Sequence, residues 1–357
     1  MLLFSLTGCG AETRVEPKGL SDSNVSLATA MDTAPGSVRI VLSAFHTKVG
    51  SPPRSELEHF RAIPDGIILA NGSAVLADKY ARRLVLMRES ADLQLLAPSG
   101  EGPGEVRHPS GLIRLGDDQF AVLDNALYRL TVFEVGGRSF SVVRSEPTMR
   151  QPRRICALPD RYVGVQYSPQ DNGFFQEFPF GAEPKRPFGR APTMPHLVNQ
   201  VYARGFILCI EKPPGVVAVL MNGELSAYDL PNQFRWKRRV PGFEPMMIEE
   251  QGSSVVTALI PDSALSANLP VALVRLDSMT AALQLMHFSR DDGTTRGVPV
   301  ARGITTLLVD TRSGTLIGSQ DDLPQVLDAL DGRILVGGNE PEPWVAITTY
   351  TLVRERR

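Results

Sequence analysis

The sequence repeats itself with a period of about 45 residues, and this repeat restricts the fold more than any other feature. The run PDGII at residues 64–68 matches PSGLI at residues 109–113. In each copy an aliphatic segment then ends in an aspartate, and an arginine follows five positions later: Asp78 and Arg83, then Asp124 and Arg129. In the second copy, four short runs of Val, Ile, Leu and Phe alternate with turn residues, which predicts four antiparallel strands.

A single sheet of four strands leaves both faces uncovered, so repeated sheets of this kind must stack against one another. Four-stranded blades arranged around an axis produce a period of this length. Six blades need roughly 270 residues, which a chain of 357 residues can supply. The sequence therefore predicts an all-β fold: a six-bladed β-propeller with four antiparallel strands per blade.

One segment also carries a resemblance to a known family. The run GEGPGE at residues 100–105 is followed by the Pro-x-Gly-aliphatic start and the Asp-x4-Arg turn. Together they resemble the bacterial six-bladed β-propellers related to NHL repeats, in the TolB-like propeller superfamily. The close match covers residues 60–145. The resemblance implies a closed ring of six blades, and it implies no particular activity, because many such proteins have none assigned.

The remaining blades are assigned from strand and turn patterns. Blades one and two are expected within residues 60–145, and the other four at residues 152–178, 201–240, 247–288 and 295–357. Residues 38–42 form a strand that precedes the first repeat. We expect this strand to close the ring by pairing with the last blade, which removes an exposed sheet edge.

The N-terminal segment predicts export and a lipid anchor. Residues 1–9, MLLFSLTGC, resemble a truncated lipoprotein signal whose lipobox ends at Cys9, the residue that would be acylated. A complete signal peptide is longer and basic at its start, so we expect the true start upstream. Residues 10–35 lack periodicity and indicate a flexible linker, which leaves 36–357 for the propeller. We expect the protein in the bacterial cell envelope, at the periplasmic or outer-membrane face.

Two further cysteines, Cys156 and Cys209, lie in apolar segments. Buried free thiols are the favoured interpretation, because cysteine packs as a small hydrophobic side chain. A disulfide is the alternative, which an exported location permits.

The repeated Asp78/Arg83 and Asp124/Arg129 pairs are interpreted as structural turns. An aspartate at a strand end can accept hydrogen bonds from the following turn, and the arginine can pair with it. Because the pair occurs in successive blades, it suits a scaffold better than a catalytic centre. We expect substitution of either aspartate by alanine to cost a similar free energy of unfolding, about 1–3 kcal/mol.

No cofactor is assigned from the sequence. The net charge of −2 gives no general attraction to nucleic acid, and the five histidines lack metal-binding spacing. Propeller lactonases hold Ca²⁺ in the central channel through oxygen ligands, which that ion prefers. Glu101, Glu105, Asp171 and Asn172 could be recruited for such a site, although nothing in the sequence shows that they converge.

A basic run at residues 235–239, around Trp236, is a candidate surface for an acidic polymer or partner, together with Arg150, Arg153 and Arg154 upstream. The favoured interpretation is an edge strand that its charges protect from pairing.

The sequence leaves two functions open. The first is a non-enzymatic binding or scaffold propeller for an unknown protein, small molecule or glycan, expected to be a monomer that meets the membrane only through its lipid anchor. The second is a Ca²⁺-dependent hydrolase, such as a lactonase, or a lyase with its site at the central channel.

Overall fold

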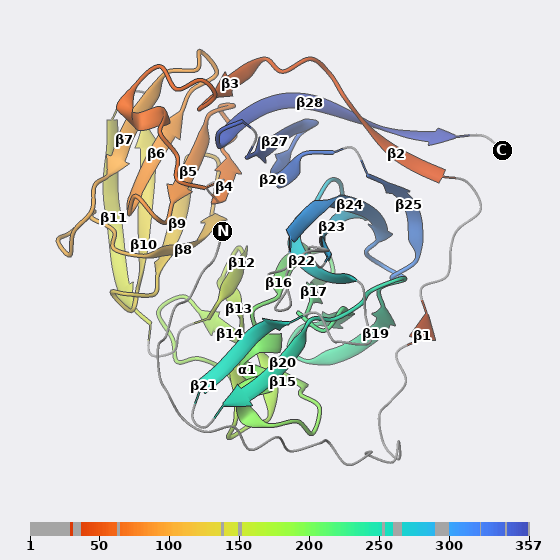
Figure 1. The fold of residues 1–357 in the computed structure, drawn as a ribbon. Helices are drawn as coiled ribbons and strands as arrows, with labels where there is room; N and C mark the ends of the chain where they lie inside the picture. The colour runs from red at the N-terminus through yellow and green to blue at the C-terminus, as the bar shows by residue number, and fades with distance from the viewer. Residues whose placement is uncertain are drawn as a thin grey trace.

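The computed structural model describes residues 29–30, 37–62, 65–136, 139–148, 152–251, 254–259, 266–289, 300–321, 323–339 and 341–355. Its sheets form six blades of four antiparallel strands around a central axis (Figure 1). The predicted all-β six-bladed propeller is therefore confirmed. Cys9 lies outside the described residues.

The first three blades follow one another along the chain. Blade 1 contains β4 (Asp65–Ile68), β5 (Ala74–Asp78), β6 (Arg83–Met87) and β7 (Leu93–Ala97). Blade 2 contains β8 (Pro109–Arg114), β9 (Gln119–Asp124), β10 (Arg129–Gly136) and β11 (Ser139–Pro147). Blade 3 contains β12 (Arg154–Leu158), β13 (Arg161–Ser168), β14 (Gly173–Pro179) and β15 (Phe188–Arg190).

The last three blades complete the ring. Blade 4 contains β16 (Phe206–Glu211), β17 (Pro214–Val219), β18 (Glu224–Asp229) and β19 (Gln233–Arg239). Blade 5 contains β22 (Ser266–Arg275), β23 (Thr280–Ser289), β24 (Val300–Asp310) and β25 (Leu316–Gln320). Blade 6 contains β26 (Gln325–Leu330), β27 (Arg333–Gly338) and β28 (Trp344–Glu355), and its outer position is filled by β2 (Ser37–Leu42) and β3 (Thr47–Val49).

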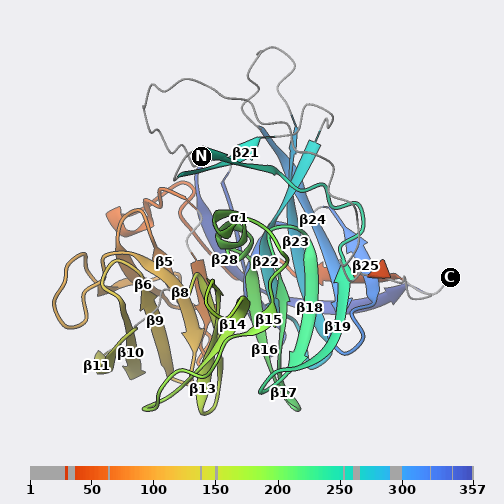
Figure 2. The ribbon, with the colours of Figure 1, turned by 90° about the horizontal axis from the view of Figure 1, so that it is seen from below.

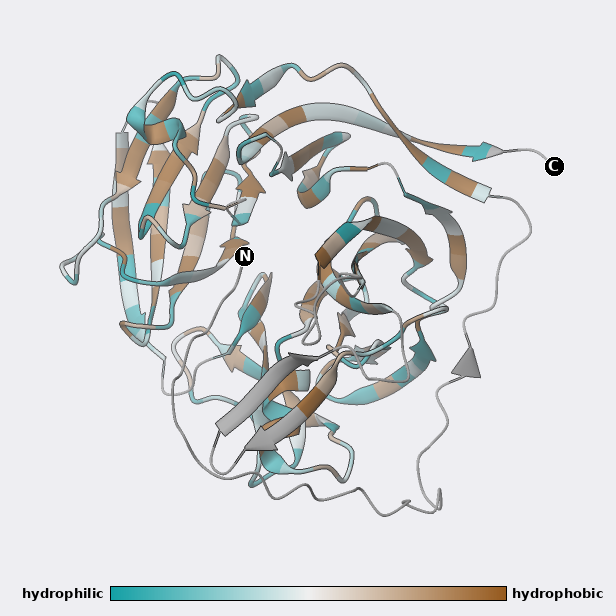
Figure 3. Cartoon of the chain, in the orientation of Figure 1, coloured by the Kyte–Doolittle hydropathy of each residue, from teal (hydrophilic) through white to brown (hydrophobic). Residues whose placement is uncertain are grey.

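The apolar core is divided among the six interfaces between neighbouring blades. Each interface holds one cluster of buried apolar side chains, as the alternating strand pattern requires. Between blades 1 and 2, for example, Phe120 and Phe133 stack with their ring centroids 5.2 Å apart. Figure 3 shows the hydrophobic residues gathered along the strands of the blades. Every blade therefore depends on both of its neighbours.

The N-terminal strand closes the ring, as predicted. β2 pairs antiparallel with β28, and Val38 and Ile40 are buried in the cluster between blades 5 and 6. The Gln320 side chain accepts a hydrogen bond from Ile40 N at 2.7 Å and donates one to Ile40 O at 3.2 Å. Gly318 comes so close to this strand that a Cβ there would lie 1.9 Å from Val38 O. The closing strand is thus fixed to two blades.

The predicted boundaries of blades five and six were wrong. The hairpin of β20 (Met247–Gln251) and β21 (Ser254–Leu259) forms a separate two-stranded sheet, so blade 5 begins at Ser266. β24 and β25, which lie inside the range 295–357 predicted for blade six, belong to blade 5. Strand patterns indicate which segments are extended. Which sheet a strand joins depends on long-range pairing, and the repeat is too weak in this part of the sequence to predict it.

The favoured interpretation of the two apolar cysteines was also wrong. Cys156 on β12 and Cys209 on β16 form a disulfide that joins the innermost strands of blades 3 and 4. The cysteines are 53 residues apart in the sequence, and closing a loop of that length stabilises a fold by about 4 kcal/mol in the chain-entropy account. Apolar neighbours suit a buried thiol and a buried disulfide equally, which explains the error.

The long crossover segments add short elements to the ring. η1 (Glu56–Glu58) precedes blade 1, and α1 (His196–Tyr202) connects blade 3 to blade 4. β1 (Thr29–Ala30), within the predicted linker, pairs in parallel with β19. Among the described helices, none has the length and apolar character needed to span a membrane.

The closing strand provides a test of the fold. Ile40→Ala should lower the free energy of unfolding by about 2–5 kcal/mol, because Ile40 is 3% exposed and its removal leaves a cavity between blades. Val41→Ala on the same strand, where the side chain is 48% exposed, should change it by less than about 0.5 kcal/mol. Urea titrations of both variants measure this. Equal effects would show that the strand does not pack as described.

Candidate functional site

The chain direction determines which residues reach the two ends of the axial channel. Each of the strands β4, β8, β12, β16, β22 and β26 contacts its counterparts in both neighbouring blades, so these six strands surround the axis. The face that carries α1 and the β20–β21 hairpin is called the upper face (Figure 2). Each inner strand starts there, so residues just before it lie at the upper mouth of the channel.

At the lower part of the channel, charged groups pair across the axis. Arg114 at the end of β8 pairs with Asp328 of β26, although blade 1 stands between their blades. Asp328 Oδ2 also accepts the N–H of Ile68 at 2.8 Å, and Arg114 Nε donates to Ile68 O at 2.8 Å. Burial raises the pKa of Asp328, and Arg114 opposes that shift. This network joins three blades.

At the upper part, one ion pair also crosses the channel. Arg154 Nη1 of β12 lies 2.7 Å from Asp65 Oδ2 of β4, so blades 1 and 3 are linked past blade 2. The Arg154 guanidinium also lies over the Phe206 ring of β16, 4.7 Å from its centroid. The charge of Arg154 is therefore balanced by a carboxylate.

Above this pair lies a group of positive side chains that we call the upper-mouth cations: Lys79, Arg153 and Arg204. Each is exposed, and each comes from a segment at the upper end of a different blade. Within the ranges that the structure describes, no carboxylate forms an ion pair with any of them. The ring thus brings together charges that are far apart in the sequence.

Local structure fixes where Arg153 and Arg204 lie. Arg153 precedes β12, and its N–H donates to Val165 O at 2.8 Å. Arg204 follows α1, and its N–H donates to Val201 O at 2.9 Å. The next residue must be glycine, because a Cβ at Gly205 would lie 1.9 Å from Val219 O. Helix α1 and the close contact between Gly205 and Val219 therefore place Arg204 at the upper end of β16.

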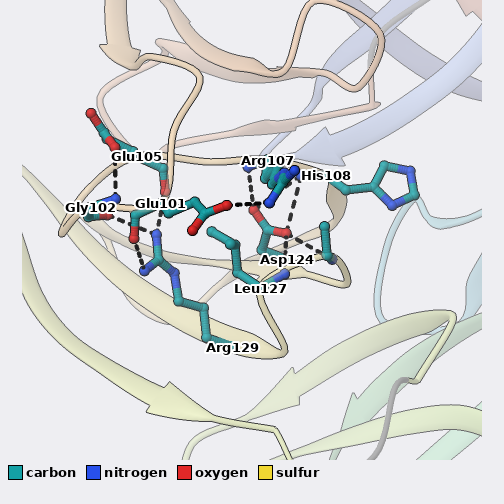
Figure 4. A network of polar contacts seen from close by, with 9 residues as sticks. Glu101, Gly102, Glu105, Arg107, His108, Asp124, Leu127 and Arg129 are labelled. Atoms are coloured by element: carbon teal, nitrogen blue, oxygen red, sulfur yellow. Dashed lines mark hydrogen bonds and ion pairs between the residues drawn. The ribbon is translucent and has the colours of Figure 1, made fainter.

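The two repeated aspartates hold the backbone near Lys79 in blade 1 and near His108 in blade 2. Lys79 follows Asp78, whose Oδ1 accepts the Ala81 N–H at 3.0 Å and so holds the β5–β6 turn. His108 precedes β8, and its N–H donates to Asp124 Oδ1 at 3.1 Å. Figure 4 shows the His108 ring pointing away from this carboxylate. The turn aspartates are therefore close to the mouth, although they do not themselves face it.

The titration of these groups reflects their crowding. Lys79 is exposed as a residue, yet partial burial of its ammonium is the largest cause that lowers its pKa, followed by Arg154, Arg153 and Arg204. Asp65 opposes the shift. Burial and then Arg153 lower the pKa of Arg204. Burial and then Lys79 lower the pKa of His108, with Arg153 and Arg82 contributing. The upper mouth is therefore strongly positive.

The repeated arginines bind the preceding crossover segments. Arg129 donates to the carbonyl oxygens of Glu101, Gly102 and Glu105 at 2.6–3.0 Å. Arg83 does the same for the crossover before blade 1, through the carbonyls of Glu56, Leu57 and His59. Arg83 also lies 3.4 Å from Asp78. Each guanidinium thus ties one blade to the segment that enters it.

The proposed Ca²⁺ ligands lie in two separate loops. Glu101 pairs with Arg107, and Glu105 accepts the Gly102 N–H at 2.7 Å in the crossover between blades 1 and 2. Asp171 and Asn172 lie in the β13–β14 turn of blade 3. Over the described part of the chain, no group of three or more His, Cys, Asp or Glu side chains is arranged to hold a metal ion.

The predicted basic surface is divided by the fold. Arg153 and Arg154 lie at the axis, whereas the run 235–239 lies within β19 on the outside of blade 4. Arg150 lies outside the described residues. Trp236 of that run is buried between blades 4 and 5, and Lys237 pairs with Glu224 at 2.8 Å. β1 partly covers the strand, so β19 is not a bare edge.

Comparisons with known proteins give the fold and no family. No protein-family model and no curated protein sequence matches the chain significantly. Among solved structures, it is similar to a member of the DUF4221 family from Bacteroides vulgatus, with a TM-score of 0.60, 11% identity, and coverage of 90% of this chain and 99% of that one. The β-propeller domain of Cps50 (Swd1) from Myceliophteria thermophila aligns with a TM-score of 0.45, 7% identity, and coverage of 82% and 99%.

The sequence did not group the upper-mouth cations: Arg153 was named only with the candidate basic surface, and Lys79 and Arg204 were not singled out. One signal was available: Arg153 directly precedes an inner strand, and Arg204 lies two positions before another. In a propeller, that position always meets the axis. His108 occupies it in blade 2.

The Asp124 network gives a test of the structural turn (Figure 4). Asp124 accepts the N–H groups of Arg107, His108, Ala126 and Leu127, at distances of 2.6–3.1 Å. Among described residues, Asp78 accepts the N–H of Ala81 and contacts Arg83. We therefore expect Asp124→Ala to cost more than about 2 kcal/mol and Asp78→Ala about 1 kcal/mol, in place of similar costs.

Thermal and urea unfolding of both variants measure these losses, with Asp124→Asn as the matched control that keeps one acceptor oxygen. Asp124→Asn should lose less than Asp124→Ala. A larger loss for Asp78→Ala than for Asp124→Ala would contradict the assignment.

Proposed function

We propose that this protein is an exported, lipid-anchored propeller of the NHL-related type that binds a small molecule, glycan or partner at the upper mouth of its channel. The observation that carries the proposal is the contrast between the two ends of the axis. Arg114 and Asp328 at the lower end pair across the channel, whereas at the upper end no carboxylate among the described residues pairs with Lys79, Arg153 or Arg204.

The chemistry of the mouth supports binding. Charges that pair within the protein stabilise the ring, whereas charges held together without partners are available to a ligand. The backbone that presents them is held in place: Asp78 fixes the turn that carries Lys79, and the N–H groups of Arg153 and Arg204 donate to Val165 O and Val201 O. A site built in this way needs little rearrangement to bind.

The disulfide supports export. Disulfides persist in oxidising compartments and are rare in the cytosol of most organisms, and Cys156–Cys209 joins two blades of this ring. The lipobox-like run that ends at Cys9 and the NHL-like repeat agree with an envelope propeller. We propose that the upper face is presented to the ligand while the N-terminal segment holds the protein at the membrane.

Binding is tested by a ligand-observed NMR screen of sugars, small acids and short peptides. We expect at least one class to bind the parent protein and the control Arg312→Gln, which changes an exposed arginine at the lower end. The same class should bind weakly to the double variant Arg153→Gln/Arg204→Gln. Equal binding by all three proteins would place the ligand elsewhere, and Ca²⁺-dependent turnover of a bound compound would favour the hydrolase instead.

The anchor has its own test. With the upstream start restored, we expect Cys9→Ala to leave the propeller folded and to release it from membranes, because the acylated residue is gone. Fractionation of cells that express the parent and the variant measures this. If both partition alike into detergent extracts, the protein is not anchored through Cys9.

A further inference from the structure

The positive charge at the upper mouth, for which the described residues supply no paired carboxylate, indicates the chemistry of the ligand. We propose that Lys79, Arg153 and Arg204 bind an oxyanion group, namely a carboxylate, phosphate or sulfate carried by a small molecule or a glycan. This inference rests on the proposed function and adds the class of group that the site recognises.

The geometry of the ring makes these charges converge. Lys79 lies in the β5–β6 turn of blade 1, Arg153 precedes β12 of blade 3, and Arg204 precedes β16 of blade 4. The same strands are linked at the level just below, where Arg154 meets Asp65 at 2.7 Å and lies over Phe206. Asp65 is therefore already occupied by Arg154, and in the described part of the chain no other carboxylate pairs with the three cations above it.

The electrostatics of the site favour an anion over a neutral ligand. The charges of Arg154, Arg153 and Arg204 all lower the pKa of Lys79, after the larger effect of burial. Holding like charges together destabilises the folded protein, and an oxyanion placed among them reverses that effect. Because the whole chain carries a net charge of −2, this positive field is local and belongs to the mouth.

The side-chain types suit an oxyanion. An arginine guanidinium presents parallel N–H donors that match two oxygens of a carboxylate or phosphate, and a lysine ammonium adds a compact charge. With arginines from two blades and a lysine from a third, the site can contact an oxyanion from three sides. A neutral sugar would gain hydrogen bonds here without relieving the repulsion.

The site should respond to pH in a defined direction. The groups around Lys79 are Arg153, Arg154, Arg204 and Asp65, and those around His108 are Lys79, Asp124, Arg153 and Arg82. Protonation of His108, below its lowered pKa, adds a positive charge beside the mouth. Deprotonation of Lys79, whose pKa is also lowered, removes one. Anion affinity should therefore fall as the pH rises.

Isothermal titration calorimetry with sulfate tests the proposal, because sulfate keeps its charge across this pH range. At constant ionic strength, we expect Arg153→Gln and Arg204→Gln each to weaken sulfate binding about tenfold or more, as for the loss of one charge-assisted hydrogen bond. The control Arg312→Gln should bind like the parent. Glucuronate and glucose 6-phosphate should compete with sulfate, and glucose should not. Which of the two competes better distinguishes a carboxylate from a phosphate ligand.

A second measurement separates a binding role from a structural one. In chloride buffer without sulfate, Lys79→Gln should raise the melting temperature, because a like charge is removed from a crowded site. The sign follows from the lowered pKa of Lys79: protonation is disfavoured in the folded state, so the destabilisation is present at neutral pH and disappears as the pH rises. Sulfate should raise the melting temperature of the parent more than that of Lys79→Gln.

The inference is overturned if sulfate binds the parent and both arginine variants equally, if the parent binds no sulfate, or if Lys79→Gln melts at a lower temperature than the parent. Its failure is distinguishable from failure of the proposed function. A neutral sugar or peptide that binds the parent and is lost in Arg153→Gln/Arg204→Gln would keep the binding function and reject the oxyanion.

Discussion

The structure depends on the requirement that every blade be covered on both faces. Each interface between blades holds its own apolar cluster, so the sheets are stable only as a closed ring. Closure is achieved by β2, which the chain places far from β28 in sequence and pairs with it in space. The outer strand of blade 6 therefore comes from the N-terminal part of the propeller sequence, whereas the other three strands come from its C-terminal part.

Closure has a consequence for charge. Six inner strands around one axis bring side chains from different blades together. At the lower end their charges are balanced, since Arg114 and Asp328 pair across blade 1. At the upper mouth, Arg154 is balanced by Asp65, whereas no carboxylate that the structure describes pairs with Lys79, Arg153 or Arg204. Keeping such charges together lowers stability, which is a common property of functional sites.

Sequence reasoning reached the fold because its signals are local. The period, the turn residues and the Asp-x4-Arg pairs survive in blades 1 and 2, and residues 38–42 stand apart as a strand before the first repeat. Blade 5 was misplaced because the β20–β21 hairpin has the composition of blade strands but pairs only with itself. The disulfide and the upper-mouth cations depend on which residues meet across blade boundaries. The sequence does not show that Cys156 pairs with Cys209, or that Arg153 lies near Arg204. The placement of the inner strands brings the members of each pair together.

Oxyanion binding at the upper mouth is tested most directly by a crystal structure of the protein soaked with selenate, an analogue of sulfate whose selenium can be located by anomalous scattering. We expect an anomalous peak at the upper mouth, within hydrogen-bond distance of Lys79, Arg153 and Arg204. An upper mouth without selenate, while the ion binds at other arginines of the same molecule, would contradict it.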